Sequence, residues 1–136
     1  PQSETMRIAM QMPLDDAGLT PDAIGYISAH GTATDRGDIA ESHATYALFG
    51  SNTPISAFKS FTGHTLGACG ALEAWTSIKM MHDNWFHGTA NLQEIDPNCA
   101  PLDYLTGTGR EIKTDIIMSN NFAFGGINTS LIFKRW

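Results

Sequence analysis

Residues 60–74 read SFTGHTLGACGALEA, and this stretch decides how the middle of the chain folds. Three glycines, Gly63, Gly67 and Gly70, surround His64 before the sequence becomes rich in alanine. Glycine inside a helix costs roughly 1 kcal/mol relative to alanine, so three of them require a reason. In a helix they would lie on roughly one face, where another backbone or a thin ligand can approach closely. We therefore expect a tightly packed central helix that holds His64 at its tip.

The predicted helix continues from this stretch to about Met81. Thr62 is its expected N-cap, because a threonine hydroxyl can accept a hydrogen bond from a free amide of the first turn. Helical spacing gives the helix an apolar side made of Leu66, Cys69, Leu72, Trp75 or Thr76, and Ile78. A helix with this apolar side needs cover from a neighbouring layer.

Helices and strands alternate on both sides of this helix. Before it we expect a helix over Glu4–Met12, which Pro13 ends or kinks, and a further turn closed by Gly18. A turn begun by Thr20 and Pro21 then leads into a strand over 23–30. A helix over Asp38–Phe49, closed by Gly50, and a strand over 54–58 follow. After it we expect a turn-rich connection over Asn84–Lys113, with a strand near Phe86, and two apolar runs, 115–122 and 128–136, that form a closing β-hairpin. This order predicts an α/β fold with a mixed β-sheet layered with α-helices, and functional groups in the loops at the strand ends.

The composition is that of an ordinary globular chain and limits the classes of partner. Its 136 residues suffice for one domain, with 42% hydrophobic and 16% charged residues. The formal net charge of −6 argues against nucleic acid and membrane surfaces as partners. With only Cys69 and Cys99, a free buried thiol at Cys69 is favoured over a disulfide, which fits a reducing, cytoplasmic location. The chain begins at Pro1, so we expect it to be a piece of something longer.

Three loops that follow predicted strands are candidates for one shared site. They read SAHGTAT (28–34), FKSFTGH (58–64) and SNNFAFGG (119–126). His30 leaves its strand directly into a Gly-Thr pair, Lys59 ends a buried strand, and His64 lies near a helix start. Each also has a simpler interpretation, a structural histidine or a surface lysine, and the residues alone leave both interpretations open.

Two glutamates and three further histidines complete the set of candidate groups. Glu41 and Glu73 lie within apolar-looking helices, where partial exposure and burial both remain open. If buried, a carboxylate needs a cation, either Lys59 or a bound ion. No metal centre is expected, because the spacing is not that of a metal site for His43, His82 and His87.

Taken together, four segments carry a specific resemblance. AHGTATDRGD (29–38), KSFTGHTLGACGALEA (59–74), ANLQEIDPNCAPLDY (90–104) and SNNFAFGGIN (119–128) resemble, in order and spacing, the C-terminal half of β-ketoacyl-[acyl-carrier-protein] synthases of the elongating type. The likeness runs from about Glu4 to Phe133. It implies a thiolase-like fold, in which two similar α/β halves pack around one active site. Residues 1–136 would then be the C-terminal thiolase-like domain, without the N-terminal half that carries the nucleophilic cysteine.

The resemblance also implies roles for individual residues. The family's catalytic histidines and motif lysine match His30, His64 and Lys59. The implied gating and substrate-binding residues are Phe122, Phe124, Gly125, Gly126, Thr32 and Thr62. Its interior glutamates match Glu41 and Glu73, which in some members lie near a monovalent cation with a serine that matches Ser119.

The chain departs from the family's pattern at several positions. The asparagine of the cation sites corresponds to Ser28, and the glycine between the two gating phenylalanines corresponds to Ala123. Alanine loses easy access to positive φ, so the gate is expected to be stiffer or set differently. Neither Cys69 nor Cys99 matches the nucleophile.

The implied reaction is a decarboxylative Claisen condensation in fatty-acid or polyketide synthesis. An acyl chain passes from an acyl carrier protein to the cysteine, and malonyl carrier protein then loses carbon dioxide and attacks the thioester. The substrates travel on the phosphopantetheine of the carrier protein, with no covalently bound cofactor. The enolate formed by decarboxylation would be stabilised by two neutral imidazole N–H donors, worth about 3 kcal/mol each. The implied partners are the carrier protein, the N-terminal half of the enzyme and a second copy in a homodimer.

Two alternatives remain from other classes. A chain-length-factor-like partner subunit would keep the fold without the nucleophile, although it would have no reason to retain both histidines, Lys59 and the gate. An autonomous small-molecule binding module would be a closed monomer without a large apolar face.

Overall fold

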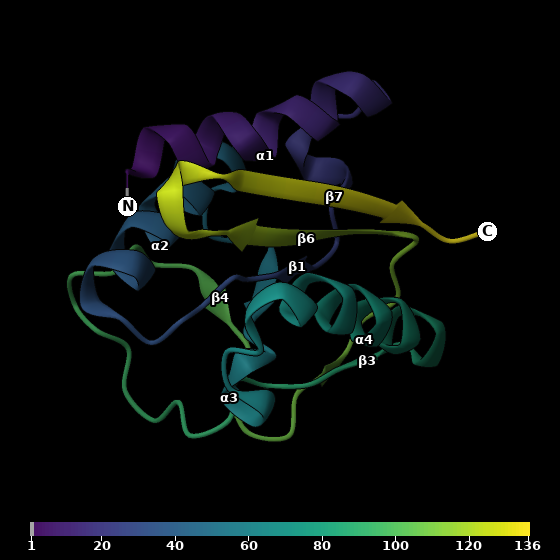
Figure 1. Cartoon of the computed structure of the whole chain (residues 1–136). Helices are drawn as coiled ribbons and strands as arrows, with labels where there is room; N and C mark the ends of the chain where they lie inside the picture. Colours follow the sequence, from purple (N-terminus) through teal and green to yellow (C-terminus); the bar gives the residue numbers. More distant parts are fainter. Residues whose placement is uncertain (1) are drawn as a thin grey trace.

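A five-stranded mixed sheet lies between two layers of helices in the computed structural model, which describes residues 2–136 (Figure 1). Its strands, in spatial order, are β4 (Asp103–Tyr104), β2 (Pro54–Ser56), β1 (Ile27–Ser28), β6 (Ile116–Phe122) and β7 (Asn128–Lys134). The first four are parallel and β7 is antiparallel to β6. A separate antiparallel pair joins β3 (Trp85–Phe86) to β5 (Arg110–Glu111). The predicted mixed sheet and closing hairpin are confirmed.

Helices cover both faces of this sheet. Figure 1 shows α1 (Ser3–Ala17) on one side and α4 (Cys69–Asp83) on the other, while α2 (Asp35–Phe49) packs beside α1. The short helix α3 (Lys59–Thr62) follows β2. Three single turns of 3₁₀-helix complete the structure: η1 (Pro21–Ala23), η2 (Leu66–Ala68) and η3 (Phe124–Gly126).

The strands supply two separate apolar cores because neighbouring side chains of a strand point to opposite faces. Ile27 and Met118 belong to a core shared with the buried side of α1. Tyr26 and Ile117, one position away in each case, belong to a second core with Met80 and other residues near the end of α4.

Three predicted element boundaries were wrong. Helix α1 runs through Pro13 to Ala17, because Leu14, beyond the proline, is fully buried in the first core. Gly18 closes it as expected, with φ of 65°. Helix α2 begins at Asp35, one turn before the predicted start. The strand predicted over 23–30 is reduced to Ile27–Ser28.

The central helix differs most from the prediction. The chain forms α3, leaves it at Gly63, and starts α4 only at Cys69. Thr62 is therefore the last residue of α3 and not the N-cap of α4. Of the three glycines only Gly70 lies within α4, so they do not share a helical face.

The buried face of α4 is also not the apolar stripe. Its buried residues are Cys69, Glu73, Ser77, Met80 and Met81. Leu66, just before the helix, and Trp75, within it, are 67% and 70% exposed. Of the predicted apolar side, Cys69 is buried and Leu72, Thr76 and Ile78 are half-buried, so only part of that side is exposed in this chain.

Candidate active site

A buried glutamate fixes the loop that carries His30. The backbone N–H groups of His30 and Gly31 donate to the two carboxylate oxygens of Glu41, each over 2.8 Å. Gly31 has φ of 44°, and a Cβ there would lie 2.6 Å from the Cβ of Ala57, so only glycine fits. Burial raises the pKa of Glu41 to about 7, against the opposing effect of the two amides. Glu41 thus holds the backbone on which the imidazole is mounted.

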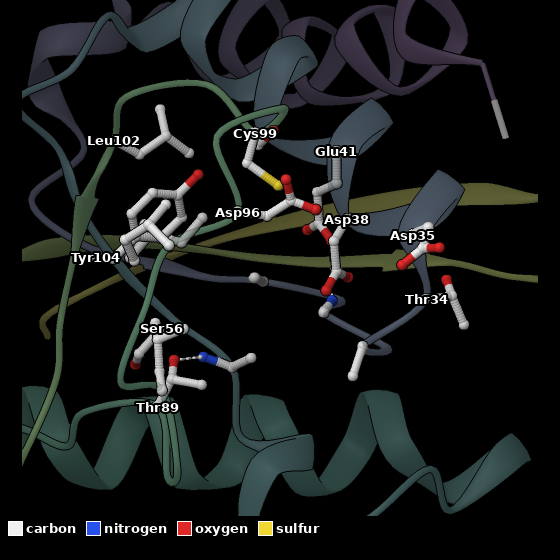
Figure 2. A pocket seen from close by; sticks show the side chains of 18 of the residues that line it. Thr34, Asp35, Asp38, Glu41, Ser56, Thr89, Asp96, Cys99, Leu102 and Tyr104 are labelled. Carbon is white, nitrogen blue, oxygen red and sulfur yellow. Dashed lines mark hydrogen bonds between the residues drawn. The ribbon is translucent and has the colours of Figure 1, made fainter.

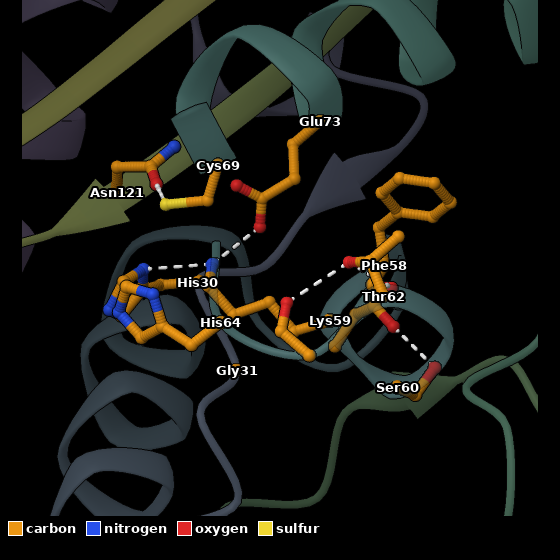
Figure 3. Close-up of polar contacts among 12 residues, drawn as sticks. His30, Gly31, Phe58, Lys59, Ser60, Thr62, His64, Cys69, Glu73 and Asn121 are labelled. Carbon is orange, nitrogen blue, oxygen red and sulfur yellow. Dashed lines mark hydrogen bonds and ion pairs between the residues drawn. The ribbon is translucent and has the colours of Figure 1, made fainter. Parts of the chain in front are cut away.

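Lys59 contacts both His30 and Glu73 (Figure 3). Its Nζ lies 3.2 Å from Nδ1 of His30 and 2.5 Å from Oε1 of Glu73. An ammonium group can only donate, so Nδ1 accepts and the proton of the neutral ring lies on Nε2. Burial, and then the positive charge of Lys59, lower the pKa of His30 to about 4, against the opposing effect of a side-chain hydrogen bond with Asn121. His30 is therefore neutral at pH 7.

His64 has the same tautomer for a different reason. It lies in the link between α3 and η2, where the backbone N–H of Leu66 donates to its Nδ1 over 3.0 Å. A neutral His64 then also carries its proton on Nε2. The centroids of the two imidazoles are 5.5 Å apart, with the rings edge to face. The structure thus brings together His30, from the loop after β1, with Lys59 and His64, from the segment after β2.

Two phenylalanines contact this pair of histidines. The Phe122 ring, at the end of β6, is buried and its centroid lies 6.0 Å from that of His30. The Phe124 ring stacks on His64 with centroids 6.4 Å apart, yet it is 85% exposed. Such an exposed aromatic ring can move away from His64 without breaking a core.

A cavity of about 580 Å³ opens beside these rings. Its lining includes the predicted residues His30, His64, Thr32, Phe122, Phe124, Gly125 and Gly126. Thr62 is not among the lining residues, because it ends α3 and its hydroxyl donates to the carbonyl of Gly63. Its predicted place on the substrate path therefore has no geometric support.

Both glutamates are buried, which resolves the alternatives left open by their helices. Glu73 is 1% exposed and Glu41 is 5% exposed. Burial raises the pKa of Glu73, and the hydrogen bond from Lys59 opposes that rise. Of the two cations considered for a buried carboxylate, Lys59 is the one in contact with Glu73.

Asn121 is the polar neighbour of this cluster that sequence reasoning missed. The thiol of Cys69, which is free and buried, donates to its Oδ1 over 3.3 Å. A signal was available, because alternation along SNNF places residue 121 on the same face of β6 as Ser119 and Ile117. The expected free thiol at Cys69 is confirmed.

A second cavity, of about 330 Å³, lies on the other side of the His30 loop (Figure 2). Ala29, Gly31 and Ala33 line it, whereas His30 and Thr32 line the first cavity. Figure 2 shows carboxylates and the Cys99 thiol around it. Burial raises the pKa of Cys99, which makes this thiol a poor nucleophile.

The remaining histidines do not join either cavity. His43 pairs with the carbonyl of Asn98, His87 lies between the rings of Phe58 and Phe61, and His82 is exposed. Within residues 2–136, no three His, Cys, Asp or Glu side chains gather as a metal site would require. None of the helices in this range combines the length and apolar character needed to cross a membrane.

Comparison with known proteins points to one family. The model of the family "Beta-ketoacyl synthase, C-terminal domain" matches residues 1–93. The chain is 41% identical over 138 residues to 3-oxoacyl-[acyl-carrier-protein] synthase 2 of Coxiella burnetii, covering 99% of this chain and 33% of that protein. It is 39% identical over 131 residues to the protein of the same name from Synechocystis, covering 94% of this chain and 31% of that protein.

Solved structures agree with this assignment. A β-ketoacyl synthase from Burkholderia phymatum is 62% identical, with a TM-score of 0.99 over 100% of this chain and 33% of its own. The ishigamide ketosynthase/chain length factor is 34% identical, with a TM-score of 0.95 over 100% of this chain and 34% of its own. The chain spans about a third of the length of these relatives. Because the family model covers more than half of the residues, the chain belongs to the β-ketoacyl synthase C-terminal domain family.

Proposed function

We propose that this chain is the C-terminal part of an elongating 3-oxoacyl-[acyl-carrier-protein] synthase, active in fatty-acid or polyketide synthesis. The observation that carries the proposal is the meeting of two Nε2–H imidazoles, His30 and His64, beside a cavity of about 580 Å³. Two fixed neutral N–H donors suit a reaction that develops negative charge on a single oxygen.

Decarboxylation of a malonyl thioester is such a reaction. When the C–CO₂⁻ bond breaks, its electron pair forms an enolate and charge moves onto the thioester oxygen. His30 and His64 would donate their Nε2–H groups to that oxygen, each worth about 3 kcal/mol. The carbanion then attacks an acyl thioester held on a cysteine outside this chain: the new C–C bond replaces the C–S bond, and the cysteine leaves as a thiolate. Cys69 and Cys99 are not offered for that role, because Cys69 is bonded to Asn121 and Cys99 lines the second cavity.

Lys59 and Glu73 would act through His30 and not on substrate. The ammonium group of Lys59 keeps Nδ1 of His30 an acceptor, so the Nε2–H remains available. Glu73 balances the buried positive charge. Removing either partner would leave an uncompensated buried charge.

The same cavity offers a path for the phosphopantetheine-bound substrate and a gate beside that path. A malonyl group on the phosphopantetheine of an acyl carrier protein would enter past Thr32 and the exposed ring of Phe124. Gly125 and Gly126, with φ of 79° and 80°, would let the backbone behind that ring rearrange.

A monovalent cation is not part of the proposal. Among residues 2–136, Glu73 Oε2 and Ser119 Oγ are buried without a hydrogen-bond partner, and Ser28 stands where the family's sites have asparagine. Two free oxygens are too few for such an ion, and Lys59 already neutralises Glu73. These residues do not fit a cation site.

The N-terminal half of the enzyme would cover the exposed apolar side chains of α4 and of the segment before it. Phe61 in α3, Leu66 in η2 and Trp75 in α4 are all more than half exposed. The isolated chain should therefore bind hydrophobic dye or self-associate and catalyse no condensation. Adding the missing half in trans should restore both solubility and activity. A monomer of these 136 residues that unfolds cooperatively and binds no hydrophobic dye would contradict this part of the proposal.

The test of the reaction uses the complete protein and malonyl carrier protein. His30→Ala and His64→Ala should each abolish release of carbon dioxide while acyl loading on the cysteine continues, because the enolate forms only in the second step. Thr62→Ala, outside the cavity, is the matched control and should decarboxylate normally. Loss of loading with normal decarboxylation would contradict these roles.

A chain-length-factor-like subunit is the second candidate. It is favoured by one observation, that two similar solved structures are described as a ketosynthase with its chain length factor. The residue at the nucleophile position of the complete protein decides between the two: cysteine supports the synthase, and any other residue supports the partner subunit.

A further inference from the structure

We propose that Met6 is a specificity-determining residue: it limits the group that the extender can carry on its α-carbon, so the site takes malonyl and discriminates against methylmalonyl. The inference rests on the proposed function, which places the malonyl thioester oxygen at the Nε2–H groups of His30 and His64.

The cavity beside the two histidines has an exposed mouth and a buried end. Thr5 and Phe124 are exposed and lie at the mouth. Four side chains, each at most 8% exposed, line the buried end: Met6, His30, Glu41 and Phe122. A phosphopantetheine arm that enters past Phe124 would bring its malonyl group to these four side chains.

Met6 is the part of the buried end that can change size without moving the donors. Among residues 2–136, Met6 and Phe122 are the two buried members of the first core that reach this cavity. Figure 1 shows the start of α1 beside the turn between β6 and β7, which places Met6 there. His30 is held by hydrogen bonds with Glu41 and Lys59, and neither bond involves Met6. A shorter side chain at position 6 therefore enlarges the buried end and leaves the imidazole fixed.

The α-carbon of the extender is the atom that this end must accommodate. It is bonded to the thioester carbonyl carbon, so it lies next to the oxygen that His30 would bind. In malonyl it carries two hydrogens, and in methylmalonyl a methyl group replaces one of them. Met6 is packed in the first core and is 5% exposed, so it yields space for that methyl group only by displacing core neighbours. One methyl group in an apolar pocket changes kcat/KM by about 10- to 200-fold.

The test compares Met6→Ala with Met10→Ala in the complete protein. Met10 lies one turn further along α1, fully buried in the same core and outside the cavity. Both variants lose the same side-chain volume, so both should lose stability, which chemical denaturation measures. Only Met6→Ala should lower the ratio of kcat/KM for malonyl over methylmalonyl carrier protein, by about tenfold. If Met6→Ala does not fold, Met6→Val should lower the ratio in the same direction by less.

The ratio also separates this inference from the proposed function. An equal ratio in wild type and Met6→Ala overturns the inference, and so does a wild type that uses both extenders equally well. In either case release of carbon dioxide from malonyl carrier protein still supports the proposed function. A wild type that releases none contradicts that function.

A readout independent of turnover tests the contact itself. In complete protein labelled with [¹³C-methyl]methionine, the signals of Met6 and Met10 are assigned from the two alanine variants. The probe is a malonyl-pantetheine amide, in which N–H replaces the thioester sulfur. Its titration should shift the Met6 methyl signal and leave that of Met10 in place. A Met6 signal that does not move overturns the inference, whether or not the protein decarboxylates malonyl carrier protein.

Discussion

The two faces of the central sheet bury different kinds of side chain. Helix α1 buries only apolar side chains, Met6, Met10 and Leu14, although the polar residues Glu41 in α2 and Asn120 beside Met10 are buried on this side too. Under α4 the sheet also buries charge, in Lys59 and Glu73. The same strands serve both faces, since β1 sends Ile27 to the first and Ser28 to the second.

This difference separates stability from chemistry. An apolar face stabilises the fold through burial alone and tolerates changes of shape at moderate cost. A buried ion pair stabilises only while both partners are present, because each ion has lost its hydration. On the α4 face the fold therefore loses stability and in return keeps Lys59, Glu73 and His30 fixed.

The largest expected effect on stability comes from breaking the buried ion pair between Lys59 and Glu73. Lys59→Met leaves the Glu73 carboxylate buried and unpaired, so the free energy of unfolding should fall by about 3–5 kcal/mol. Chemical denaturation of the complete protein measures this. Lys79→Met, which removes the exposed pair with Asp83, should cost less than about 1 kcal/mol.

A double variant sharpens the comparison. Lys59→Met with Glu73→Leu makes the α4 face apolar, and should recover most of the lost stability without recovering decarboxylation. Equal stability losses at Lys59 and Lys79 would show that the buried pair has no special energetic role.

On the other face, Leu14→Ala should cost about 3 kcal/mol through the cavity it leaves. The decarboxylation rate per folded molecule should not change, because Leu14 touches only the first core. Denaturation and activity measured on the same preparation check both halves of this expectation. If activity fell more than the amount of folded protein, Leu14 would influence the site, and this expectation would be wrong.

The same contrast explains which parts were predictable from sequence. Two apolar runs with β-branched residues, separated by Gly125 and Gly126, predicted the closing hairpin, and β6 and β7 are the two long strands of the sheet. The burial of α4 was predicted wrongly, because helical spacing equates buried with apolar, and here Glu73 and Ser77 face inward. Pattern alone cannot identify a face that is polar because it serves a site.

The site residues were predicted from sequence motifs more than from hydrophobic patterning. His30, Lys59 and His64 were found because each lies in a loop after a strand, and the loops converge. Asn121 was missed because its hydrogen bond from Cys69 joins residues 52 positions apart in the printed sequence. Thr62 was misplaced because the break between α3 and α4 depends on the left-handed residues Gly63 and Leu66.

The pH dependence of stability gives a smaller effect within the site. Glu41 has a pKa raised to about 7 from 4.5, so its contribution falls as pH rises through that interval. His30 has a pKa lowered to about 4 from 6.5, so its contribution rises over nearly the same interval. Between pH 4.5 and 6.5 the two slopes should cancel in the wild type.

Glu41→Gln exposes one of these slopes. Relative to wild type, its unfolding free energy should increase by roughly 1 kcal/mol per pH unit across that window, since only the His30 slope remains. His30→Gln should show the opposite slope. Denaturant titrations at half-unit pH intervals measure both, and parallel curves for variant and wild type would refute the assignment of these two groups.

The smallest effect is expected where the site meets solvent, at Ala123. Its φ of −79° and ψ of 166° are ordinary for alanine, and its N–H donates to the carbonyl of Ile127 over 2.8 Å. Ala123→Gly should therefore cost only about 0.5–1 kcal/mol, by giving the unfolded chain more freedom. The expected change is in the gate: glycine at 123 allows positive φ next to Phe124, which should change the acyl-chain preference or the rate.

Ala33→Gly is the matched control. Ala33 has φ of 57°, so glycine there relieves strain, should raise stability, and should leave acyl preference unaltered. Rates with short and long acyl donors decide the matter, and the same ratio in both variants would show that Ala123 does not set the gate.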